Sequence, residues 1–314
     1  MNNSLGITLI FPMAGKGERF GHKFKPFLKV GDTTFIQRAV DSFEKYLNHI
    51  KEVVFIFLEE QDRLYNVKTL LKEMFPNLPH QCIILEHRTN GPAETVKRAL
   101  QKDERILGKI IICDCDHYLD TEPIFKYLEE SNQDHCVIPL WNLRGENIKA
   151  WSVAALSDEG YIEDITEKEI PKSPGSFFGV IGCYYFNQIE DIILNDKLFI
   201  SEIIKDLIKK GKKVKGVLIF NAEFFGDPQR LKDLLDVRKK IKGAIFCDLD
   251  GTLIEHEDIP SYEAPLKVLP RTIEKLKQWS DEGYNLILTT SRKSKNEIEL
   301  VEALKKANIF YDRL

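Results

Sequence analysis

Short apolar runs separated by longer amphipathic stretches are the feature that most limits how this chain can fold. They recur through the first two thirds of the sequence, at residues 7–11, 53–58, 81–85, 109–113, 136–140, 180–186 and 214–219. Brief apolar runs of this kind are typical of buried strands in a largely parallel sheet. Residues 35–46 and 92–100 have the periodicity of covering helices. The pattern predicts an α/β domain with a mixed, mostly parallel sheet, whose functional residues lie at strand ends.

A second α/β unit follows. A charged amphipathic helix is expected at 229–240, and a new apolar strand at 244–247 follows it. A length of 314 residues fits about two domains of roughly 100–200 residues each, so we place the boundary near 236–243. The later segment reads as strand, loop, helix at 270–282, strand at 285–288 and helix at 296–307. At roughly 72 residues it is short for such a domain, and we expect it to be incomplete.

Charge and apolar content exclude several classes of protein. The net charge of −4 argues against nonspecific binding to nucleic acid or anionic membranes, although it permits a local basic pocket for phosphates. The longest apolar run, 53–58, is far shorter than the ~18 residues of a membrane span, and the N-terminus does not look like a signal peptide. We therefore expect a cytoplasmic protein. Its six cysteines lack Cys-x-x-Cys spacing, which favours buried reduced thiols over disulfides or zinc.

A glycine-rich segment follows the first apolar run directly. Gly15 and Gly17 allow a tight bend that presents backbone N–H groups to phosphate oxygens, and Arg19 can add a bidentate clamp. Such a loop suits a nucleoside triphosphate. Taken alone, a Gly-x-Gly after a strand is better explained as a plain turn.

The wider context gives this loop a family resemblance. Together with Lys25-Pro26 and the helix opening at Phe35, it resembles the signature of GT-A-fold, Rossmann-like nucleotidyltransferases, the sugar-phosphate nucleotidylyltransferases and their cytidylyltransferase relatives. The resemblance implies a nucleotidyltransferase domain over 1–238. It implies that Arg19 steadies the β and γ phosphates and that Lys25 stabilises charge on the α-phosphate. The short spacer between these two residues favours CTP. The residues implied to cradle the nucleotide are Ala14, Gly15, Lys16 and Gly17.

The helix expected at 92–100 opens on a possible base-binding residue. Gly91 is similar to the family's glycine that lies against the nucleobase. The alternative is an ordinary helix start with Pro92 in the first turn.

Two acids stand at the end of the predicted strand 109–113. Because an unpaired buried carboxylate is costly, Asp114 and Asp116 need a partner there, and Mg²⁺ held with substrate phosphates supplies one. The resemblance makes Asp116 the expected ligand and Asp114 the second. His117 is expected to be structural or to face the substrate, and the cysteines at 113 and 115 to be packing residues.

Three later segments are similar to acceptor-binding and closing elements of the family. The resemblance implies that Glu167 and Lys168 contact the acceptor's sugar and phosphate, that Gly182 leaves room for the acceptor, and that Asp227 is a further Mg²⁺ ligand. An exposed charged turn is the alternative for the first pair, and a helix N-cap is the alternative for Asp227.

The implied reaction is attack by an acceptor's phosphate or phosphonate oxygen on the α-phosphorus of a nucleoside triphosphate, with release of pyrophosphate. Because the attacking oxygen is already anionic, no general base is needed, and positioning with charge neutralisation carries catalysis. The acceptor expected is a sugar or alditol phosphate for capsular or surface polysaccharide precursors.

The second unit carries a different motif. Asp248 and Asp250 end an apolar strand in Asp-x-Asp-Gly-Thr, which resembles the haloacid dehalogenase superfamily. In that family the first acid attacks phosphorus and the second is the general acid and base, with Mg²⁺ between them, while Thr290 is implied to hold the phosphoryl group. Lys293 and Lys295 lack the spacing expected of the later lysine motif. The family's remaining acids are not found, so this half is expected to be truncated or degenerate, and its phosphatase activity is doubtful.

Two alternative functions stay open at this point. A GT-A glycosyltransferase would use Asp114 and Asp116 as its metal motif, although it needs no triphosphate clamp. A phosphatase in the second half could be the principal activity, with the first half as a nucleotide-binding module. The oligomeric state leaves no pattern in the sequence.

Overall fold

The computed structural model describes residues 4–131, 134–143, 146–173, 175–193, 197–240, 243–257, 265–292 and 297–314. The chain divides into two compact units, residues 1–232 and 233–314, so that the division falls within one helix, α8 (Pro228–Lys240). Each unit is α/β, as expected, and each is described by itself. No helix in the described part of the chain combines the length and apolar character needed to cross a bilayer.

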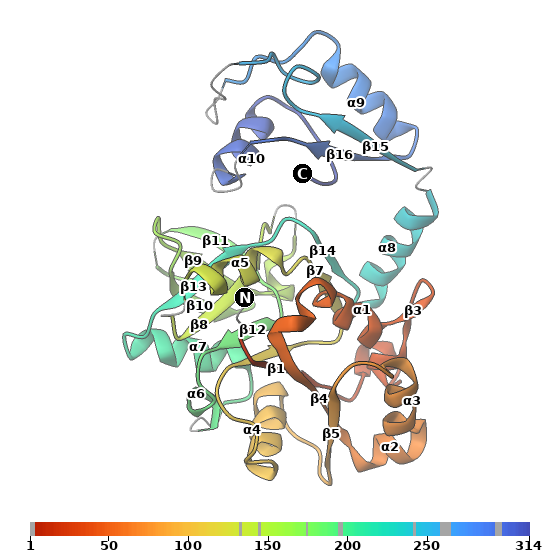
Figure 1. The fold of residues 1–314 in the computed structure, drawn as a ribbon, viewed down its shortest axis with the longest axis vertical. Coiled ribbons are helices and arrows are strands. Elements are labelled where there is room, and N and C mark those ends of the chain that lie inside the picture. Colours follow the sequence, from red (N-terminus) through yellow and green to blue (C-terminus); the bar gives the residue numbers. More distant parts are fainter. Residues whose placement is uncertain are drawn as a thin grey trace. The chain divides into compact units, whose positions relative to one another are not determined.

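A mixed sheet forms the centre of the first unit (Figure 1). Its order is β10-β9-β11-β8-β12-β6-β1-β4-β5, and β13 pairs with β8. The core pairs β6-β1, β1-β4 and β4-β5 are parallel, whereas β12, β11, β9 and β10 run antiparallel to their neighbours. The strands are β1 (Ile7–Pro12), β4 (Ile50–Leu58), β5 (His80–Leu85), β6 (Ile110–Cys113), β8 (Cys136–Trp141), β9 (Ser152–Leu156), β10 (Ile162–Glu167), β11 (Ser176–Val180), β12 (Cys183–Phe186) and β13 (Val214–Leu218).

Helices cover both faces of this sheet, which explains why its core strands are apolar throughout. Along β4, Val53, Phe55 and Phe57 pack into one apolar cluster, and the residues between them pack into the other. Helices α4 and α7 contribute to one cluster, and α1, α3 and α5 to the opposite one. Successive side chains of a strand point to opposite faces, so a strand buried on both sides loses the alternation of polar and apolar residues.

The remaining elements of the first unit are short. The helices are α1 (Phe35–Asp41), α2 (Glu59–Tyr65), α3 (Val67–Met74), α4 (Pro92–Lys102), α5 (Glu122–Glu130), α6 (Glu190–Ile193) and α7 (Ile200–Lys209). The 3₁₀ turns are η1 (Glu18–Phe20), η2 (Lys25–Phe27), η3 (Glu44–His49) and η4 (Ile148–Ala150). Two strand pairs lie outside the large sheet: β2 (Lys29–Val30) with β3 (Thr33–Thr34), and β7 (His117–Leu119) with β14 (Ala222–Phe224).

Two predicted elements are divided in the structure. The helix expected over 35–46 is α1 followed by a turn and η3. The strand expected over 180–186 breaks between β11 and β12. At the break, Cys183 N donates to the Ile181 carbonyl at 2.6 Å, and Asp114 N donates to the Gly182 carbonyl at 2.7 Å. Apolar content alone predicted a continuous strand, whereas the chain bends here to meet the end of β6.

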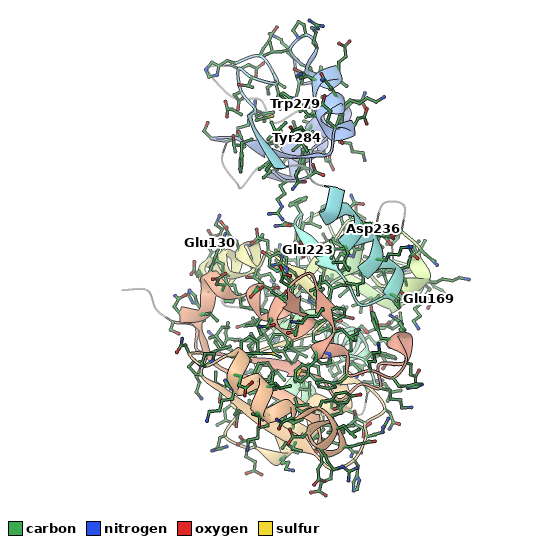
Figure 2. All side chains as sticks on the ribbon, turned by 90° about the vertical axis from the view of Figure 1, so that its right-hand side faces the viewer. Glu130, Glu169, Glu223, Asp236, Trp279 and Tyr284 are labelled. Carbon is green, nitrogen blue, oxygen red and sulfur yellow. The ribbon has the colours of Figure 1, made fainter. Side chains whose placement is uncertain are left out.

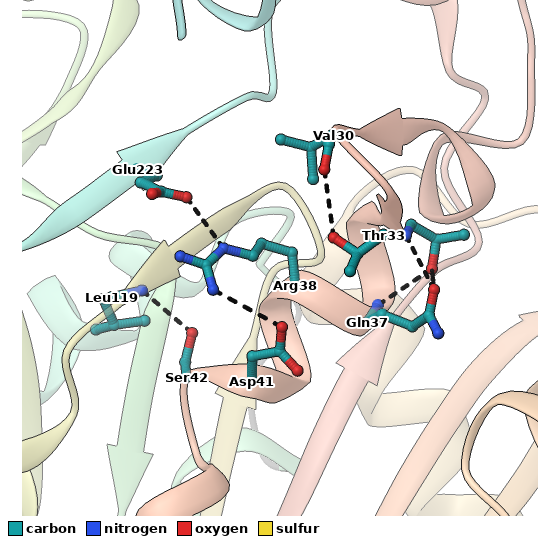
Figure 3. Close-up of polar contacts among 9 residues, drawn as sticks. Val30, Thr33, Gln37, Arg38, Asp41, Ser42, Leu119 and Glu223 are labelled. Carbon is teal, nitrogen blue, oxygen red and sulfur yellow. Dashed lines mark hydrogen bonds and ion pairs between the residues drawn. The ribbon is translucent and has the colours of Figure 1, made fainter. Parts of the chain in front are cut away.

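An arginine on α1 ties this helix to β14 (Figure 3). Arg38 Nε donates to Glu223 Oε2 at 3.0 Å, and the guanidinium lies 3.7 Å from the centre of the Tyr118 ring. Nearby, Ser42 Oγ accepts from Leu119 N at 3.1 Å. These contacts fix the β7-β14 pair against α1, and β14 leads directly into the segment that carries Gly226 and Asp227.

The second unit is a small parallel pair of strands with two helices. β15 (Gly243–Asp248) pairs with β16 (Tyr284–Thr289), and α9 (Thr272–Asp281) and α10 (Glu297–Lys306) pack on them. Figure 2 shows Trp279 on α9 and Tyr284 at the start of β16. Predicted strands and helices in this unit match the observed ones to within a few residues, but Lys293 and Lys295 lie outside the described residues.

Replacing Thr34 by alanine should lower the free energy of unfolding by about 1 kcal/mol. Thr34 begins α1 with a capping box, in which its Oγ1 accepts from Gln37 N at 3.3 Å and Gln37 Oε1 accepts from Thr34 N at 3.0 Å. Urea denaturation of Thr34→Ala and Thr34→Ser measures the effect. Serine keeps the hydroxyl and should retain most of the stability, so equal losses in both variants would contradict the assignment.

Candidate active site

The glycine-rich loop leaves the carboxyl end of β1 and closes on itself. Gly17 has a left-handed backbone (φ 63°), and a Cβ there would lie 2.0 Å from the Lys23 carbonyl oxygen, so only glycine fits without a shift. Gln61 at the start of α2 donates from Nε2 to the Gly15 carbonyl at 3.1 Å, while its Oε1 accepts from Leu58 N. The loop is therefore held against the end of β4.

Lys25 lies beneath this loop and pairs with a carboxylate at the end of β6. Its Nζ donates to Asp116 Oδ2, and both side chains are about one quarter exposed. A cavity of about 190 Å³ opens beside them, lined by Pro12, Met13, Gly15, Gly17, Lys25, Pro26, Asp114, Cys115 and Asp116. The structure thus brings together the predicted phosphate loop, the predicted lysine and both predicted acids.

Two glycines make room for the two carboxylates. A Cβ at Gly182 would lie 2.2 Å from Asp114 Oδ2, and a Cβ at Gly226 would lie 2.1 Å from Asp116 Oδ2. The family resemblance implied that Gly182 leaves room for the acceptor. In the structure, the nearest group to the space above Gly182 is the Asp114 carboxylate, although the glycine also lines a larger cavity.

The two carboxylates differ in their electrostatic surroundings. Burial and the neighbouring Asp116 charge raise the pKa of Asp114 to about 6. Burial also acts on Asp116, but the Lys25 ammonium and His117 outweigh it and hold the pKa of Asp116 well below its usual range. His117 Nδ1 lies 3.6 Å from Asp116 Oδ1, and its Nε2 lies 3.6 Å from Cys113 Sγ. Asp114 is the less compensated charge.

These residues fit a divalent cation that is completed by substrate. Asp114 is partly buried, and in the described part of the chain no donor hydrogen-bonds to its carboxylate. A hard cation would supply the missing positive charge. Among the described residues, no three His, Cys, Asp or Glu side chains lie close enough to form a complete metal site. Asp114 and Asp116 would therefore hold Mg²⁺ together with phosphate oxygens.

A second, larger cavity of about 460 Å³ shares these two aspartates. It is lined by Arg19, Asp114, Asp116, His117, Lys149, Ala150, Trp151, Ser152, Val180, Gly182, Tyr184, Phe224, Gly226, Asp227 and Arg230. The smaller cavity touches the glycine-rich loop, and the larger one is walled by η4, β9, β12 and the β14–α8 connection. The two aspartates stand where the cavities meet.

Three other predicted site residues of the first unit, Gly91, Asp227 and Lys16, differ in their surroundings. The space a side chain would take at Gly91 is filled by the Leu198 carbonyl, 2.3 Å from an ideal Cβ. Asp227 lines the larger cavity and also caps α8, since its Oδ1 accepts from Gln229 N at 2.9 Å. Lys16 is exposed and lies 3.6 Å from Glu18. The base-binding and metal-binding roles of Gly91 and Asp227 stay predictions.

Glu167 and Lys168 at the end of β10 face different ways. Glu167 Oε1 accepts from Ser152 Oγ at 2.6 Å and from Ser201 Oγ, which leaves it bound within the protein. Lys168 is exposed, has a left-handed backbone (φ 61°), and is absent from the described residues that line the two cavities. Its predicted contact with the acceptor receives no support from this geometry.

Three residues of the larger cavity were missed in the sequence. Lys149 and Trp151 lie in no motif, and Arg230 lies in the predicted closing segment but was given no role there. The three meet because the β8–β9 connection folds against the start of α8. The Arg230 guanidinium lies 4.7 Å from the Trp151 ring centre, and the ring contacts Trp141 and Phe224 at 4.6 and 4.8 Å. The two tryptophans, Trp141 and Trp151, were the sequence feature that could have indicated this cavity wall.

In the second unit, the predicted acids lie at the end of β15. Asp248 is exposed, while Asp250 accepts from Arg292 Nε at 3.0 Å and from Thr290 Oγ1 at 3.3 Å. Arg292, which is almost fully buried, lowers the pKa of Asp250 by these hydrogen bonds. The carboxylate expected to act as general acid and base is thus engaged by a guanidinium.

Comparison with known families places both parts of the chain. Residues 10–169, half of the chain, match the model of the MobA-like NTP transferase domain. The chain belongs to this family. Residues 245–311 match the haloacid dehalogenase-like hydrolase model, as the Asp-x-Asp motif indicated. No curated protein matches the chain.

Solved structures similar to this NTP transferase domain share its fold. A nucleoside-diphosphate-sugar pyrophosphorylase from Vibrio cholerae is 23% identical, with a TM-score of 0.60 over 73% of this chain and 99% of its own. An inositol-1-phosphate CTP transferase from T. maritima is 14% identical, with a TM-score of 0.57 over 75% of this chain and 97% of its own. HddC from Yersinia pseudotuberculosis, in complex with GMP-PN, is 17% identical, with a TM-score of 0.56 over 73% of this chain and 98% of its own. The predicted Rossmann-like nucleotidyltransferase fold is confirmed.

Replacing Gly17 by alanine should cost about 1–2 kcal/mol of stability, because the left-handed backbone disfavours a side chain and the Cβ meets the Lys23 backbone. Gly15→Ala is the matched control, since a Cβ at Gly15 has no atom within 4 Å. Its free energy of unfolding should change by less than about 0.5 kcal/mol. Thermal unfolding compares the two, and a Gly15→Ala variant as unstable as Gly17→Ala would contradict this conformation of the loop.

Asp114 should make the metal-free protein lose stability as the pH rises. Its pKa is about 6 when folded and 3.8 as an ordinary aspartate, so the unfolded chain releases this proton first. Relative to Asp114→Asn, wild-type stability in a chelator should be greatest below pH about 4 and fall towards pH about 6. Adding Mg²⁺ should reduce the fall. A stability difference that does not vary over this range would contradict the shift.

Proposed function

We propose that this chain transfers a nucleoside monophosphate from a nucleoside triphosphate, CTP by preference, to a phosphorylated sugar or alditol. The observation that carries the proposal is the pair of cavities that meet at Asp114 and Asp116. One cavity lies under the glycine-rich loop and has the size and donors for phosphates. The other is large enough for a small acceptor, and the aspartates with Lys25 stand between them.

The chemistry follows from this arrangement. An acceptor phosphate oxygen forms a bond to the α-phosphorus, the bond from that phosphorus to the β-bridging oxygen breaks, and pyrophosphate leaves with the electron pair. Lys25, whose pKa stays above its usual value because the acids around it outweigh its burial, keeps its charge throughout. It neutralises charge on the α-phosphate, and Arg19 binds the leaving phosphates. Bound Mg²⁺ would supply further charge neutralisation.

Capsular or surface polysaccharide precursors are the proposed destination of the product. Support for a phosphorylated carbohydrate acceptor comes from the fold shared with a nucleoside-diphosphate-sugar pyrophosphorylase and an inositol-1-phosphate CTP transferase. The preference for CTP rests on the short spacer between Arg19 and Lys25. No nucleic acid or membrane partner is proposed.

The test is pyrophosphate release with Mg²⁺ and each of CTP, UTP, GTP, ATP and dTTP against a panel of sugar, alditol and amino-alcohol phosphates. Release that requires CTP and one acceptor together would support the proposal. Release with another nucleotide would refute the preference for CTP. Transfer of a sugar from a nucleotide sugar, without pyrophosphate, would instead favour a glycosyltransferase, for which Asp114 and Asp116 would be the metal motif.

Replacing Lys25 by alanine should lower turnover by about 10²–10³-fold, because it removes a positioned cation from the charge that develops at phosphorus. Lys29→Ala is the control, since Lys29 is exposed and its Nζ donates only to the nearby Asp32 carbonyl among the described residues. Initial rates of pyrophosphate release measure both variants, and circular dichroism checks folding. Near-normal turnover in Lys25→Ala would remove the lysine from the proposed role.

A further inference from the structure

The larger cavity offers few cations that are free to bind an anionic acceptor. Those among its described lining residues are Arg19, His117, Lys149 and Arg230. A phosphorylated acceptor approaching Asp114, Asp116 and the triphosphate is repelled by all three, so it needs a cation of its own. One of these four side chains must supply that cation.

Two of the four are already engaged within the protein. Arg230 pairs with Glu146 through both terminal nitrogens and stacks on Trp151. His117 is 3% exposed and its ring lies between Cys113 and Asp116. Both would have to give up these contacts to bind a ligand.

Arg19 also lines this cavity, but it directly follows the glycine-rich loop. It lies in η1, which starts at Gly17 of the glycine-rich loop and is closed by the hydrogen bond from Gly21 N to the Glu18 carbonyl. Its place on this loop suits the leaving phosphates of the nucleotide. Lys149, on η4, remains.

Lys149 is exposed, yet its backbone is fixed. Its N–H donates to Asn147 Oδ1 at 3.1 Å, which caps η4, and the following residues close the turn through Ala150 N to Asn147 O and Trp151 N to Ile148 O. The Trp151 carbonyl accepts from Lys168 N at 2.8 Å, so η4 is tied to the end of β10. Within the described residues, the Lys149 ammonium forms no ion pair.

We propose that Lys149 binds the anionic group of the acceptor, a phosphomonoester or phosphonate, in the larger cavity. One oxygen of that group attacks phosphorus while another is held by the ammonium, beside the fixed aromatic wall of Trp151. Lys149 thus takes the acceptor-phosphate contact that the family resemblance assigned to Lys168. This inference rests on the proposed function, since it takes the larger cavity to be the acceptor site.

Steady-state kinetics of the full chain test the assignment, with the acceptor that supports pyrophosphate release. Lys149→Ala should raise the KM for that acceptor about tenfold or more, the loss expected for one charged hydrogen bond, and leave the KM for the nucleotide near the wild-type value. Lys149→Arg should restore most of the acceptor affinity. Lys172→Ala, which removes an exposed lysine that lines neither cavity, should have no effect.

Lys168 is the competing candidate for this contact, so Lys168→Ala is measured in the same way. If Lys168→Ala raises the acceptor KM more than Lys149→Ala does, the assignment of Lys149 is overturned. It is also overturned if Lys149→Ala raises the KM for the nucleotide as much as that for the acceptor. Circular dichroism of each variant confirms that a change in KM does not come from unfolding.

A binding measurement separates this inference from the proposed function. Methyl phosphate, the smallest phosphomonoester, is titrated by ³¹P nuclear magnetic resonance into protein whose triphosphate loop is filled with Mg²⁺ and inorganic tripolyphosphate. Binding should weaken about tenfold in Lys149→Ala and stay unchanged in Lys172→Ala. The role of Lys149 is overturned if Lys149→Ala binds methyl phosphate as tightly as Lys172→Ala does, or if the wild type does not bind it. A wild type that binds methyl phosphate through Lys149 but releases no pyrophosphate would refute only the proposed function.

Discussion

Two carboxylates at the end of a buried strand are the constraint on which the rest of the site depends. Asp114 and Asp116 follow directly on β6, which is buried on both faces, and negative charge at such a place must be compensated. Lys25 reaches Asp116 from beneath the glycine-rich loop, and glycines at 182 and 226 leave space for the two carboxylates. The break between β11 and β12, η2 and the β14–α8 connection each contribute one of these contacts.

The same constraint bears on the proposed reaction, which would bring two anionic substrates together. Because both aspartates line both cavities, a nucleotide on one side and an acceptor on the other would meet where negative charge is already greatest. The site must therefore bring cations from more than one element. Lys25 and Arg19 come from the segment after β1, whereas Lys149 comes from η4. In the proposed reaction, each of the two anions would therefore be met by its own positive side chain.

The second unit has its acids arranged in another way. Asp248 is open to solvent, but Arg292 and Thr290 hold the Asp250 carboxylate by direct hydrogen bonds. A guanidinium that neutralises one of the two acids lowers its tendency to take up a proton. The resemblance to haloacid dehalogenases therefore describes the fold and motif of this unit well, while the state of Asp250 is set by a neighbour on the loop after β16 that the motif did not include.

Sequence alone determined the α/β class, the parallel core and the glycine-rich loop, because each depends on local order along the chain: an apolar run, then glycine, then charge. Tertiary structure decided the rest. Three features depend on segments far apart in sequence: whether residues 180–186 form one strand, what fills the space at Gly91, and which lysine lines the larger cavity. Lys149 and Lys168 carry the same charge and are both exposed, and only the folding of η4 against β10 places one on the cavity wall and leaves the other outside.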